Sequence, residues 1–600
     1  MQPKDKYERI ENYGIIGNLH TVALVSMNGS IDFMCYHRFD SPTIFGSLLD
    51  SERGGTFSIS PTMENVTYKQ LYLPDTAVLV SRFFSDKGMA EIIDFMPVLD
   101  DEKNFSLIRK ITSIKGDISY EMNLSPRFDY GRAEHRFQQT DSGYLIESND
   151  FQHSALQLTS NIKMESSNGN VHSKFTLKES ESAYFILESN ESYHQRASKP
   201  DKFVEDSYQD TIRFWQSWIE ASTYSGRWIE MVNRSAITLK LLTSYSNSSM
   251  VAAATFGLPE AIPGERNWDY RYTWIRDAAL SVYALLRIGY PNEAASFLAW
   301  VLAAVENGET PGVLYDLDGN IPLTEQIDPE LEGYRKSRPV RWGNAAASQL
   351  QNDVLGEILD CAFQWSRCHG NIEAGLWSSL AKLVEAAEKG WREPDHGIWE
   401  VRKSRRPFTY SAVMCHTAVV RGAAIAEQFG LPANIPRWRA SAEDIRRTIL
   451  EEAWDKERET LTAYLGGRAL DASLLSLPLR RFIAFDDPRM VGTARAIARE
   501  LDAGDGLLFR YNPEEIDDGL PGREGAFLLC SFWMVDNLAG QGRIDEALRM
   551  YESLCRRAGP LGLLPEQIDP ESGLFLGNYP QAFSHIGLIS SGILLSRLMK

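Results

Sequence analysis

Along residues 1–203, apolar and polar residues alternate in short runs, as in strands that bury one face. Two such runs, 21–25 and 31–35, flank the turn Asn28-Gly29-Ser30 and predict a β-hairpin. Further runs occupy 77–84, 90–96, 107–114, 143–148 and 183–187, with Gly, Asn, Asp and Ser between them. This part of the chain is therefore predicted to form a large antiparallel β-sandwich.

The period becomes helical at Val204, and residues 204–225 predict a linker helix. Residues 226–600 have almost no strand pattern and predict a helical domain. Twelve helices are expected to begin near Arg227, Tyr270, Asn292, Asn344, Ile372, Thr409, Ile435, Ala472, Pro488, Gly525, Ile544 and Pro580. Paired as hairpins, they fit a closed (α/α)6 barrel, a six-hairpin toroid. A helical solenoid is the competing architecture, but the segments show no repeat of fixed period.

Length and charge narrow the class of protein. The chain has 600 residues, more than one hydrophobic core usually holds, which agrees with two domains. The formal net charge of −19 argues against nucleic acid or an anionic membrane as the main partner and fits an enzyme with a neutral small substrate. The sequence shows no basic-then-apolar leader and no run long enough for a membrane span, so we expect a cytoplasmic protein. The six cysteines lack metal-ligand spacing, and several of them lie in apolar helical runs and are expected to be reduced core residues.

The most unusual stretch is 267–277, in which aromatic residues alternate with Arg and Asp ahead of an apolar run. Charges at the start of a buried helix need partners, and each ring needs a surface to pack on. One interpretation is a structural pair formed by Arg276 and Asp277. The other is a sugar subsite, in which the flat rings of this stretch stack on a pyranose face while its Arg and Asp bind neighbouring hydroxyls.

Two glutamates are candidates for acid–base chemistry. Glu400 lies between Trp399 and Val401, and apolar neighbours favour the protonated carboxyl that a general acid needs. Glu566 lies in the loop ahead of the last expected helix and is a candidate base for water. Two carboxylates from two loops on one rim are the minimal machinery of glycoside hydrolysis. Taken singly, each is as well interpreted as a solvated residue, because glutamate is mostly exposed.

Two further loops carry charged residues whose role stays open. The hexapeptide Glu-Gln-Ile-Asp-Pro-Glu occurs at 325–330 and again at 566–571, and a recurring Asp-Pro turn explains the repeat as well as catalysis does. The loop 333–344 is rich in cations, which indicates either a phosphate or nucleic-acid patch or arginines paired with carboxylates and sugar hydroxyls. Arg510 and Glu524 belong to another polar loop. The sequence contains no GxSxG, Walker A or HExxH pattern.

Several of these motifs together resemble glycoside hydrolase family 15, and in particular its bacterial and archaeal branch of trehalases and glucoamylase-like enzymes. The resemblance covers nearly the whole chain and is carried by residues 272–277, 337–345, 397–402, 565–567 and 580–585. It implies a β-sandwich followed by an (α/α)6 barrel. It also implies that glucose is released from the non-reducing end of an α-glucoside with inversion.

The resemblance assigns roles to individual residues. Glu400 is expected to be the general acid and Glu566 the general base, which removes Glu325 from the candidates. Arg276 and Asp277 are expected to hold the terminal glucose. The further residues expected to bind substrate are Tyr270, Trp274, Arg341, Trp342, Trp399, Arg510 and Glu524. Val401 stands where fungal glucoamylases carry a second carboxylate, and Trp342 stands where this branch is expected to have an aliphatic residue.

We therefore expect a trehalase-like hydrolase that needs no metal and no organic cofactor, and for which a homodimer is a candidate assembly. The alternative is a glucoamylase or an isomalto-oligosaccharide glucohydrolase that acts on α-1,4 or α-1,6 glucans. An alternative of another class is a carbohydrate-binding protein that has lost catalysis, because fold alone does not fix function.

Overall fold

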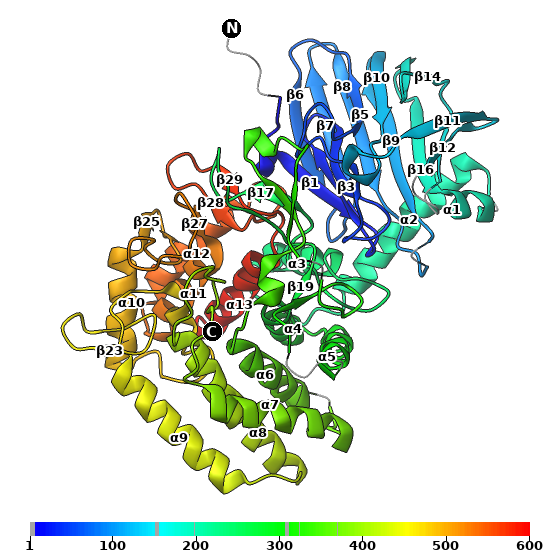
Figure 1. The fold of residues 1–600 in the computed structure, drawn as a ribbon. Helices are drawn as coiled ribbons and strands as arrows, with labels where there is room; N and C mark the ends of the chain where they lie inside the picture. Colours follow the sequence, from blue (N-terminus) through cyan, green and yellow to red (C-terminus); the bar gives the residue numbers. More distant parts are fainter. Residues whose placement is uncertain are drawn as a thin grey trace.

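The computed structural model describes residues 6–101, 103–149, 155–196, 198–306, 311–322, 324–368 and 370–600. They form an N-terminal β part and a C-terminal helical part (Figure 1). The β part contains two antiparallel sheets of eight strands each. The first sheet contains β1 (Tyr13–Gly17), β2 (Val22–Ser26), β3 (Ser30–Cys35), β4 (Thr43–Phe45), β5 (Thr56–Pro61), β10 (Ile118–Ser125), β14 (Glu165–Ser167) and β15 (Asn170–Leu177). The second contains β6 (Thr67–Tyr72), β7 (Leu79–Ser85), β8 (Gly88–Phe95), β9 (Ser106–Lys115), β11 (His135–Thr140), β12 (Gly143–Ser148), β13 (Leu156–Ser160) and β16 (Ser182–Ser189).

The two sheets pack face to face as a β-sandwich. Alternate residues of β10, including Tyr120 and Met122, are buried between the sheets while their neighbours are exposed. Arg109 on the second sheet donates hydrogen bonds to the carbonyls of Phe57 and Gly29 on the first sheet, and it pairs with the buried Asp94. Each of the seven alternating runs predicted from the sequence is a strand, so the sandwich prediction is confirmed.

The helical part follows two connecting helices, α1 (Asn190–Gln195) and α2 (Pro200–Ile219). The predicted linker helix is therefore present but begins at Pro200 rather than Val204, because proline suits the first turn of a helix. The domain helices are α3 (Ile229–Leu241), α4 (Ile275–Arg287), α5 (Pro291–Glu306), α6 (Asp353–Cys368), α7 (Ala374–Gly390), α8 (Thr409–Phe429), α9 (Ile435–Glu452), α10 (Pro488–Glu500), α11 (Leu528–Gly540), α12 (Ile544–Arg557) and α13 (Ala582–Leu598).

These helices form two concentric rings. The inner ring runs from α4 through α6, α8, the short 3-10 helix η5 (Ala472–Ser476) and α11 to α13, which packs against α4 and closes the ring. The outer helices pack against the inner ones, as α9 does on α8 and α12 on α11. The sequence explains this division, because α11 is buried on all sides whereas α12 buries only a narrow stripe. The arrangement is an (α/α)6 barrel, as predicted.

One predicted helix is different in the structure. The segment near Ala472 forms only the five-residue helix η5, although it takes the place of an inner barrel helix. Asp471 caps its first turn by accepting a hydrogen bond from the amide of Ser473. Pro478 follows shortly afterwards and cannot continue a helical hydrogen-bond ladder.

The loops that lead into the inner helices gather at one end of the barrel and contain short strands. These strands are β17 (Phe256–Pro259), β18 (Asn267–Asp269), β19 (Thr273–Trp274), β20 (Leu314–Tyr315), β21 (Gln326–Asp328), β22 (Val340–Trp342), β23 (Trp454–Asp455), β24 (Thr460–Leu461), β25 (Asp502–Gly504), β26 (Leu507–Leu508), β27 (Ala526–Phe527), β28 (Gln567–Ile568) and β29 (Phe575–Leu576). The sandwich supports this end, because the buried Arg271 pairs with Asp269 and reaches the carbonyl of Ser41 and the hydroxyl of Tyr130 in the sandwich.

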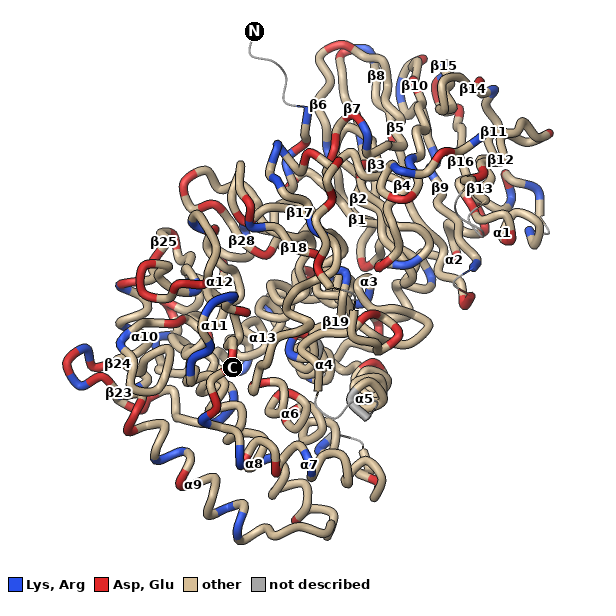
Figure 2. The backbone as a smooth tube through the Cα atoms, in the orientation of Figure 1, with Lys and Arg blue, Asp and Glu red and all other residues tan. Residues whose placement is uncertain are grey.

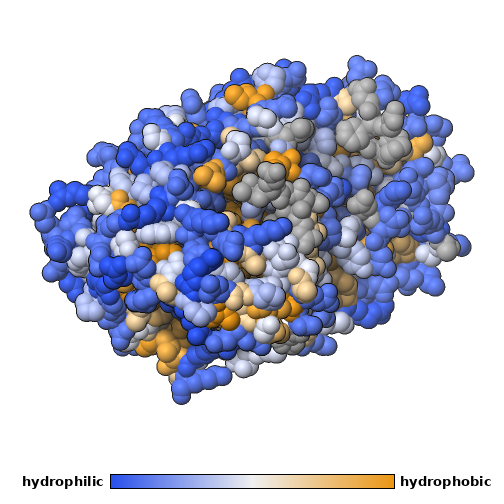
Figure 3. Space-filling model, turned by 60° about the horizontal axis from the view of Figure 1, so that its bottom comes forward, coloured by the Kyte–Doolittle hydropathy of each residue, from blue (hydrophilic) through white to orange (hydrophobic). Residues whose placement is uncertain are grey.

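The surface carries both signs of charge. Lys and Arg are interspersed with Asp and Glu along both parts of the molecule (Figure 2). On the face shown in Figure 3, hydrophilic residues dominate and the hydrophobic ones form small separate patches. Within the described ranges, every helix is too short or too polar to cross a bilayer.

Candidate active site

A cavity open to solvent lies where the loops before the inner helices meet. Its walls come from segments far apart in the chain: the β18–α4 region, the loop between α7 and α8, the loop between α10 and α11, and the loop between α12 and α13. We call it the inner cavity. It is lined by Ala252, Tyr270, Trp274, Arg276, Asp277, Ile398, Trp399, Glu400, Arg510, Phe527, Glu566, Gln581 and Phe583.

Glu400 enters the inner cavity from a tight turn. Its φ of 60° lies in the left-handed region, which residues other than glycine adopt rarely, and such conformations cluster at functional sites. The amide of Glu400 donates to the carbonyl of Gly397 at 3.2 Å. Its Oε1 accepts a hydrogen bond from Trp274 Nε1 at 2.7 Å and lies 3.4 Å from an Arg276 nitrogen. The apolar surroundings predicted for Glu400 are therefore only partly present, because a cation touches its carboxylate.

Glu566 is far more buried, with 1% of its surface exposed. Its Oε1 accepts a hydrogen bond from the Tyr270 hydroxyl at 2.7 Å, while its Oε2 is buried without a hydrogen-bond partner. Gly577 makes room for this carboxyl group, since a Cβ at that position would lie 2.3 Å from Glu566 Oε2. Burial, reinforced by the negative charge of Glu260, raises the pKa of Glu566 to about 8, although Arg510 acts in the opposite direction.

Two rings of the stretch 267–277, which we call the aromatic motif, connect the two carboxylates. Tyr270 bonds to Glu566 and Trp274 bonds to Glu400, and the two rings pack edge to face with their centroids 5.3 Å apart. Both carboxyl groups are thus held by one pair of rings in one small cavity. The structure brings together the candidate acid and base that the sequence placed in separate loops.

Arg276 and Asp277 begin α4 and line the same cavity. Arg276 is anchored by Gln351 at 2.8 Å and by Asp353 at 3.3 Å, yet its Nε has no partner. Asp277 Oδ1 is buried without a partner as well. Burial, together with the negative charge of Glu400, raises the pKa of Asp277 to about 8 despite the nearby Arg276. Buried polar atoms without partners are costly unless a ligand satisfies them, and sugar hydroxyls both donate and accept.

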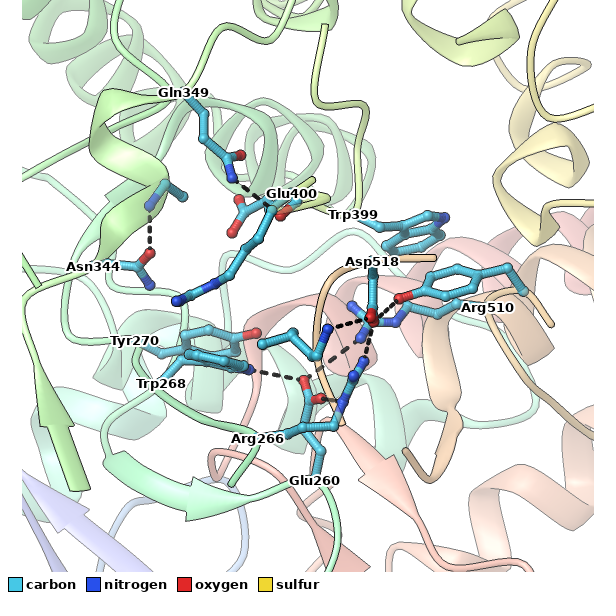
Figure 4. A pocket seen from close by; sticks show the side chains of 14 residues that line it. Glu260, Arg266, Trp268, Tyr270, Asn344, Gln349, Trp399, Glu400, Arg510 and Asp518 are labelled. Carbon is cyan, nitrogen blue, oxygen red and sulfur yellow. Dashed lines mark hydrogen bonds and ion pairs between the residues drawn. The ribbon is translucent and has the colours of Figure 1, made fainter. Parts of the chain in front are cut away.

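A second cavity, the outer cavity, adjoins the first (Figure 4). Four residues line both cavities: Tyr270, Trp399, Glu400 and Arg510. The outer cavity is also lined by Glu260, Arg266, Trp268, Asn344, Ala346, Gln349, Arg402, Tyr511, Asp518 and Leu520. A ligand that filled both cavities would therefore pass these four residues.

A buried ion cluster forms one wall of the outer cavity. Arg266 pairs with Glu260 at 3.0 Å and with Asp518, whose Oδ2 also accepts a hydrogen bond from Tyr511. Arg510 forms a bidentate pair with Glu524 and lies over the ring of Trp399 at 5.3 Å. Figure 4 shows Glu260 and Arg266 across the cavity from Glu400. Arranged in this way, the wall presents fixed donors and acceptors to a polar, uncharged ligand.

Comparison with known proteins identifies the family. Residues 226–593 match the family model described as "Glycosyl hydrolases family 15", and residues 4–187 match one described as "Trehalase-like, N-terminal". The chain belongs to glycosyl hydrolase family 15. It is a glycoside hydrolase of the α-glucosidic type.

Relatives and a solved structure extend the family match over nearly the whole chain. A protein named trehalase from Mycolicibacterium smegmatis is 36% identical, over 98% of this chain and 91% of its own length. A trehalase from Thermoplasma volcanium is 35% identical over 97% of this chain and 93% of its own. The crystal structure of a bacterial glucoamylase complexed with acarbose superimposes with a TM-score of 0.73, covering 99% of this chain and 95% of that one at 14% identity. This structure shows the same fold.

Not every residue that the sequence pointed to reaches a cavity of this family 15 enzyme. Trp342 stacks on Tyr130 of the sandwich, with ring centroids 6.1 Å apart, and lines neither cavity. Arg341 lies over Trp268, outside both linings. Glu524 stands behind Arg510 and anchors it. The other expected residues, namely Glu400, Glu566, Tyr270, Trp274, Arg276, Asp277, Trp399 and Arg510, line the inner cavity.

Sequence reasoning missed the acidic residues of the outer wall. Glu260 and Asp518 lie in loops, where a single acidic residue normally indicates a solvated surface. Only the fold shows that both are buried and form ion pairs with Arg266. A usable signal was the position of Glu260 and Arg266 directly ahead of the aromatic motif.

Proposed function

We propose that the protein is an exo-acting α-glucosidase that hydrolyses trehalose with inversion at the attacked carbon. The observation that carries the proposal is that Glu400 and Glu566 line one cavity together with Trp274, Arg276 and Asp277. The choice of trehalose is supported by similarity to proteins named trehalases along nearly the full chain.

Glu400 is proposed as the general acid, which gives its proton to the glycosidic oxygen. Its place at the junction of the inner and outer cavities supports this role, because the bond to be broken lies between the two sugars. Trp274 and Arg276 fix its carboxyl group through Oε1. The positioned acid contributes to catalysis by protonating the departing glucose.

Glu566 is proposed as the general base, which takes a proton from the water that attacks the opposite face of the sugar. Its Oε1 accepts a hydrogen bond from Tyr270, whereas its buried Oε2 has no hydrogen-bond partner and is the oxygen proposed to take the proton. In an inverting enzyme the two carboxyl groups stand about 6.5–9.5 Å apart, with room for this water. The separation of Glu400 and Glu566 is expected to fall in that range.

The raised pKa of Glu566 sets the pH at which this base is ionised. Burial and the negative charge of Glu260 raise the pKa of Glu566 to about 8 in the free enzyme. A base must be ionised, so kcat/KM is expected to rise with pH up to about 8. The raised pKa by itself also suits an acid, and the assignment of roles therefore rests on the family resemblance and on the variants described in the Discussion.

The terminal glucose is proposed to bind in the inner cavity. Asp277 Oδ1 and Arg276 Nε, both buried without partners, supply an acceptor and a donor for its hydroxyls. The rings of Tyr270 and Trp274 form the wall on which its apolar face packs. These contacts would hold the reacting carbon between the two carboxyl groups.

The experiment that tests this function is glucose release from trehalose, maltose, isomaltose, maltoheptaose and dextran. Preferential cleavage of trehalose is expected. Preference for maltoheptaose or dextran would replace trehalose by a glucan as substrate and keep the mechanism. Release of glucose from none of them would favour the carbohydrate-binding alternative. A cytoplasmic location and a homodimer stay predictions from the sequence.

A further inference from the structure

The first copy of the repeated hexapeptide has a partner that its sequence does not reveal. Glu325 immediately precedes β21, as Glu566 precedes β28, so the two copies place their first glutamate alike. Whereas Glu566 is buried beside Tyr270, Glu325 accepts a bidentate pair from Arg402, at 3.0 and 2.7 Å. It also lies 3.4 Å from Arg341 Nε. Arginines contact both carboxylate oxygens of Glu325, so the glutamate of the first copy differs from Glu566 in its environment.

Arg402 connects that pair to the substrate site. It follows Glu400 by two positions in the same loop, and its side chain lines the outer cavity. Its guanidinium carbon lies 4.4 Å from the ring centroid of Trp268, which lines the same cavity. Its backbone amide donates to the carbonyl of Asp518 at 2.9 Å and fixes the loop to the opposite wall. Arg341 stacks on Trp268 as well, at 4.9 Å, but lies outside the cavity lining.

The geometry leaves Arg402 with donors to offer. A guanidinium has five N–H groups, and two of those of Arg402 bind Glu325. The side chain is 29% exposed and lines the outer cavity. Sugar hydroxyls accept hydrogen bonds from guanidinium groups, and a fork fixed by a carboxylate loses little entropy when it binds a further acceptor.

We propose that Arg402 binds the leaving glucose and is a specificity-determining residue, and that Glu325 is the residue that positions it. The inference rests on the proposed trehalose hydrolysis, in which Glu400 protonates the bond between the two sugars. A sugar in the outer cavity then lies on the leaving side of that bond. A substrate whose leaving group is a single small atom makes no use of Arg402.

The test compares two substrates, trehalose and α-D-glucosyl fluoride, whose fluoride leaves without occupying the outer cavity. The variants are Arg402→Ala, Arg402→Lys and Glu325→Gln, with Arg405→Ala, an exposed arginine of the same loop, as the matched control. Arg402→Ala is expected to lower kcat/KM for trehalose roughly 10- to 100-fold, the usual loss of a charged hydrogen bond. Its kcat/KM for the fluoride is expected to stay within about twofold of the parent enzyme, which also shows that the variant folds.

The two positions are expected to differ in a second way. Glu325→Gln should raise KM for trehalose and leave kcat nearly unchanged, because it loosens Arg402 without removing its donors. Arg402→Lys should not restore the parent kcat/KM, because lysine lacks the planar fork. Arg405→Ala should match the parent enzyme on both substrates.

Several results would overturn the proposal. One is an unchanged kcat/KM of Arg402→Ala for trehalose. Another is an equal loss of kcat/KM on trehalose and on the fluoride, because an equal loss would indicate a purely structural role of Arg402. A parent enzyme that hydrolyses the fluoride but not trehalose would overturn the proposed function itself. The two failures are thus distinguishable in one experiment.

Discussion

Replacing Glu566 with Gln is expected to stabilise the fold at high pH while it abolishes turnover. Ionised Glu566 is buried, so its proton is held more tightly in the folded chain than in the unfolded one. The difference between a pKa of about 8 in the fold and the ordinary 4.5 corresponds to about 5 kcal/mol of unfolding free energy above pH 8. Because this folded-state pKa is raised, the parent protein has its full stability below about pH 4.5 and loses this amount progressively as the pH rises to about 8.

Glutamine does not ionise and can still accept the hydrogen bond from Tyr270. The unfolding free energy of Glu566→Gln should therefore not fall by this amount as the pH rises. With an unfolding entropy of about 2.1 cal/mol/K per residue over a chain of 600 residues, 5 kcal/mol corresponds to a Tm difference of about 4 °C.

The assay is thermal unfolding of both proteins at pH 4.5 and pH 8.5, with Glu571→Gln, an exposed residue of the same loop, as the control. The Tm advantage of Glu566→Gln should be near zero at the lower pH and about 4 °C at the higher one. The Tm difference between Glu571→Gln and the parent protein should be the same at both pH values. If the difference between Glu566→Gln and the parent protein does not grow with pH, burial does not raise this pKa and the reasoning fails.

Four other variants test the roles of Glu400, Asp277, Glu260 and Trp342. Glu400→Gln should lower kcat for trehalose by about 10²- to 10⁴-fold but keep activity on α-D-glucosyl fluoride, because fluoride leaves without a proton. Glu566→Gln should lose activity on both substrates. The reverse pattern would exchange the roles of the two residues. Asp277→Asn should lower kcat/KM for trehalose by about 10- to 100-fold because it weakens the grip on the terminal glucose, and an unchanged kcat/KM would remove Asp277 from the site. Glu260→Gln should move the acid limb of the kcat/KM–pH profile to lower pH, because the negative charge of Glu260 raises the pKa of Glu566; an unmoved limb would contradict this coupling. Trp342→Phe should keep kcat/KM within about twofold but lower Tm, and a large loss of activity would return Trp342 to the substrate site.

Strands with one buried face are among the elements that the sequence predicted well. The run predicted at 90–96 lies on β8, where buried and half-buried residues alternate and which has a neighbouring strand on each side. By contrast, β14 is exposed at all of its positions and carries no alternation from which it could be found. The segment at Ala472 is apolar enough to resemble a helix, yet only its place in the barrel shows that a short 3-10 turn suffices there.

The candidate site divides in the same way. The aromatic motif and the two glutamates could be found from the sequence, because rings and charges next to buried segments are unusual. The effect of Glu260 on Glu566 could not, because the two residues are far apart in the chain and meet only in the fold. Trp342 was misleading for a related reason: a large ring in a polar loop suits a sugar site as well as a domain interface, and here it packs on Tyr130.

The central claim is that Glu400 and Glu566 act on opposite faces of the sugar, and the configuration of the first products tests it most directly. Proton NMR during the first minutes of trehalose hydrolysis, before mutarotation, resolves α- from β-glucose. Equal amounts of both anomers are expected, because inversion yields β-glucose from the attacked sugar while the leaving sugar stays α. Formation of α-glucose alone would show retention and would contradict the single-displacement mechanism.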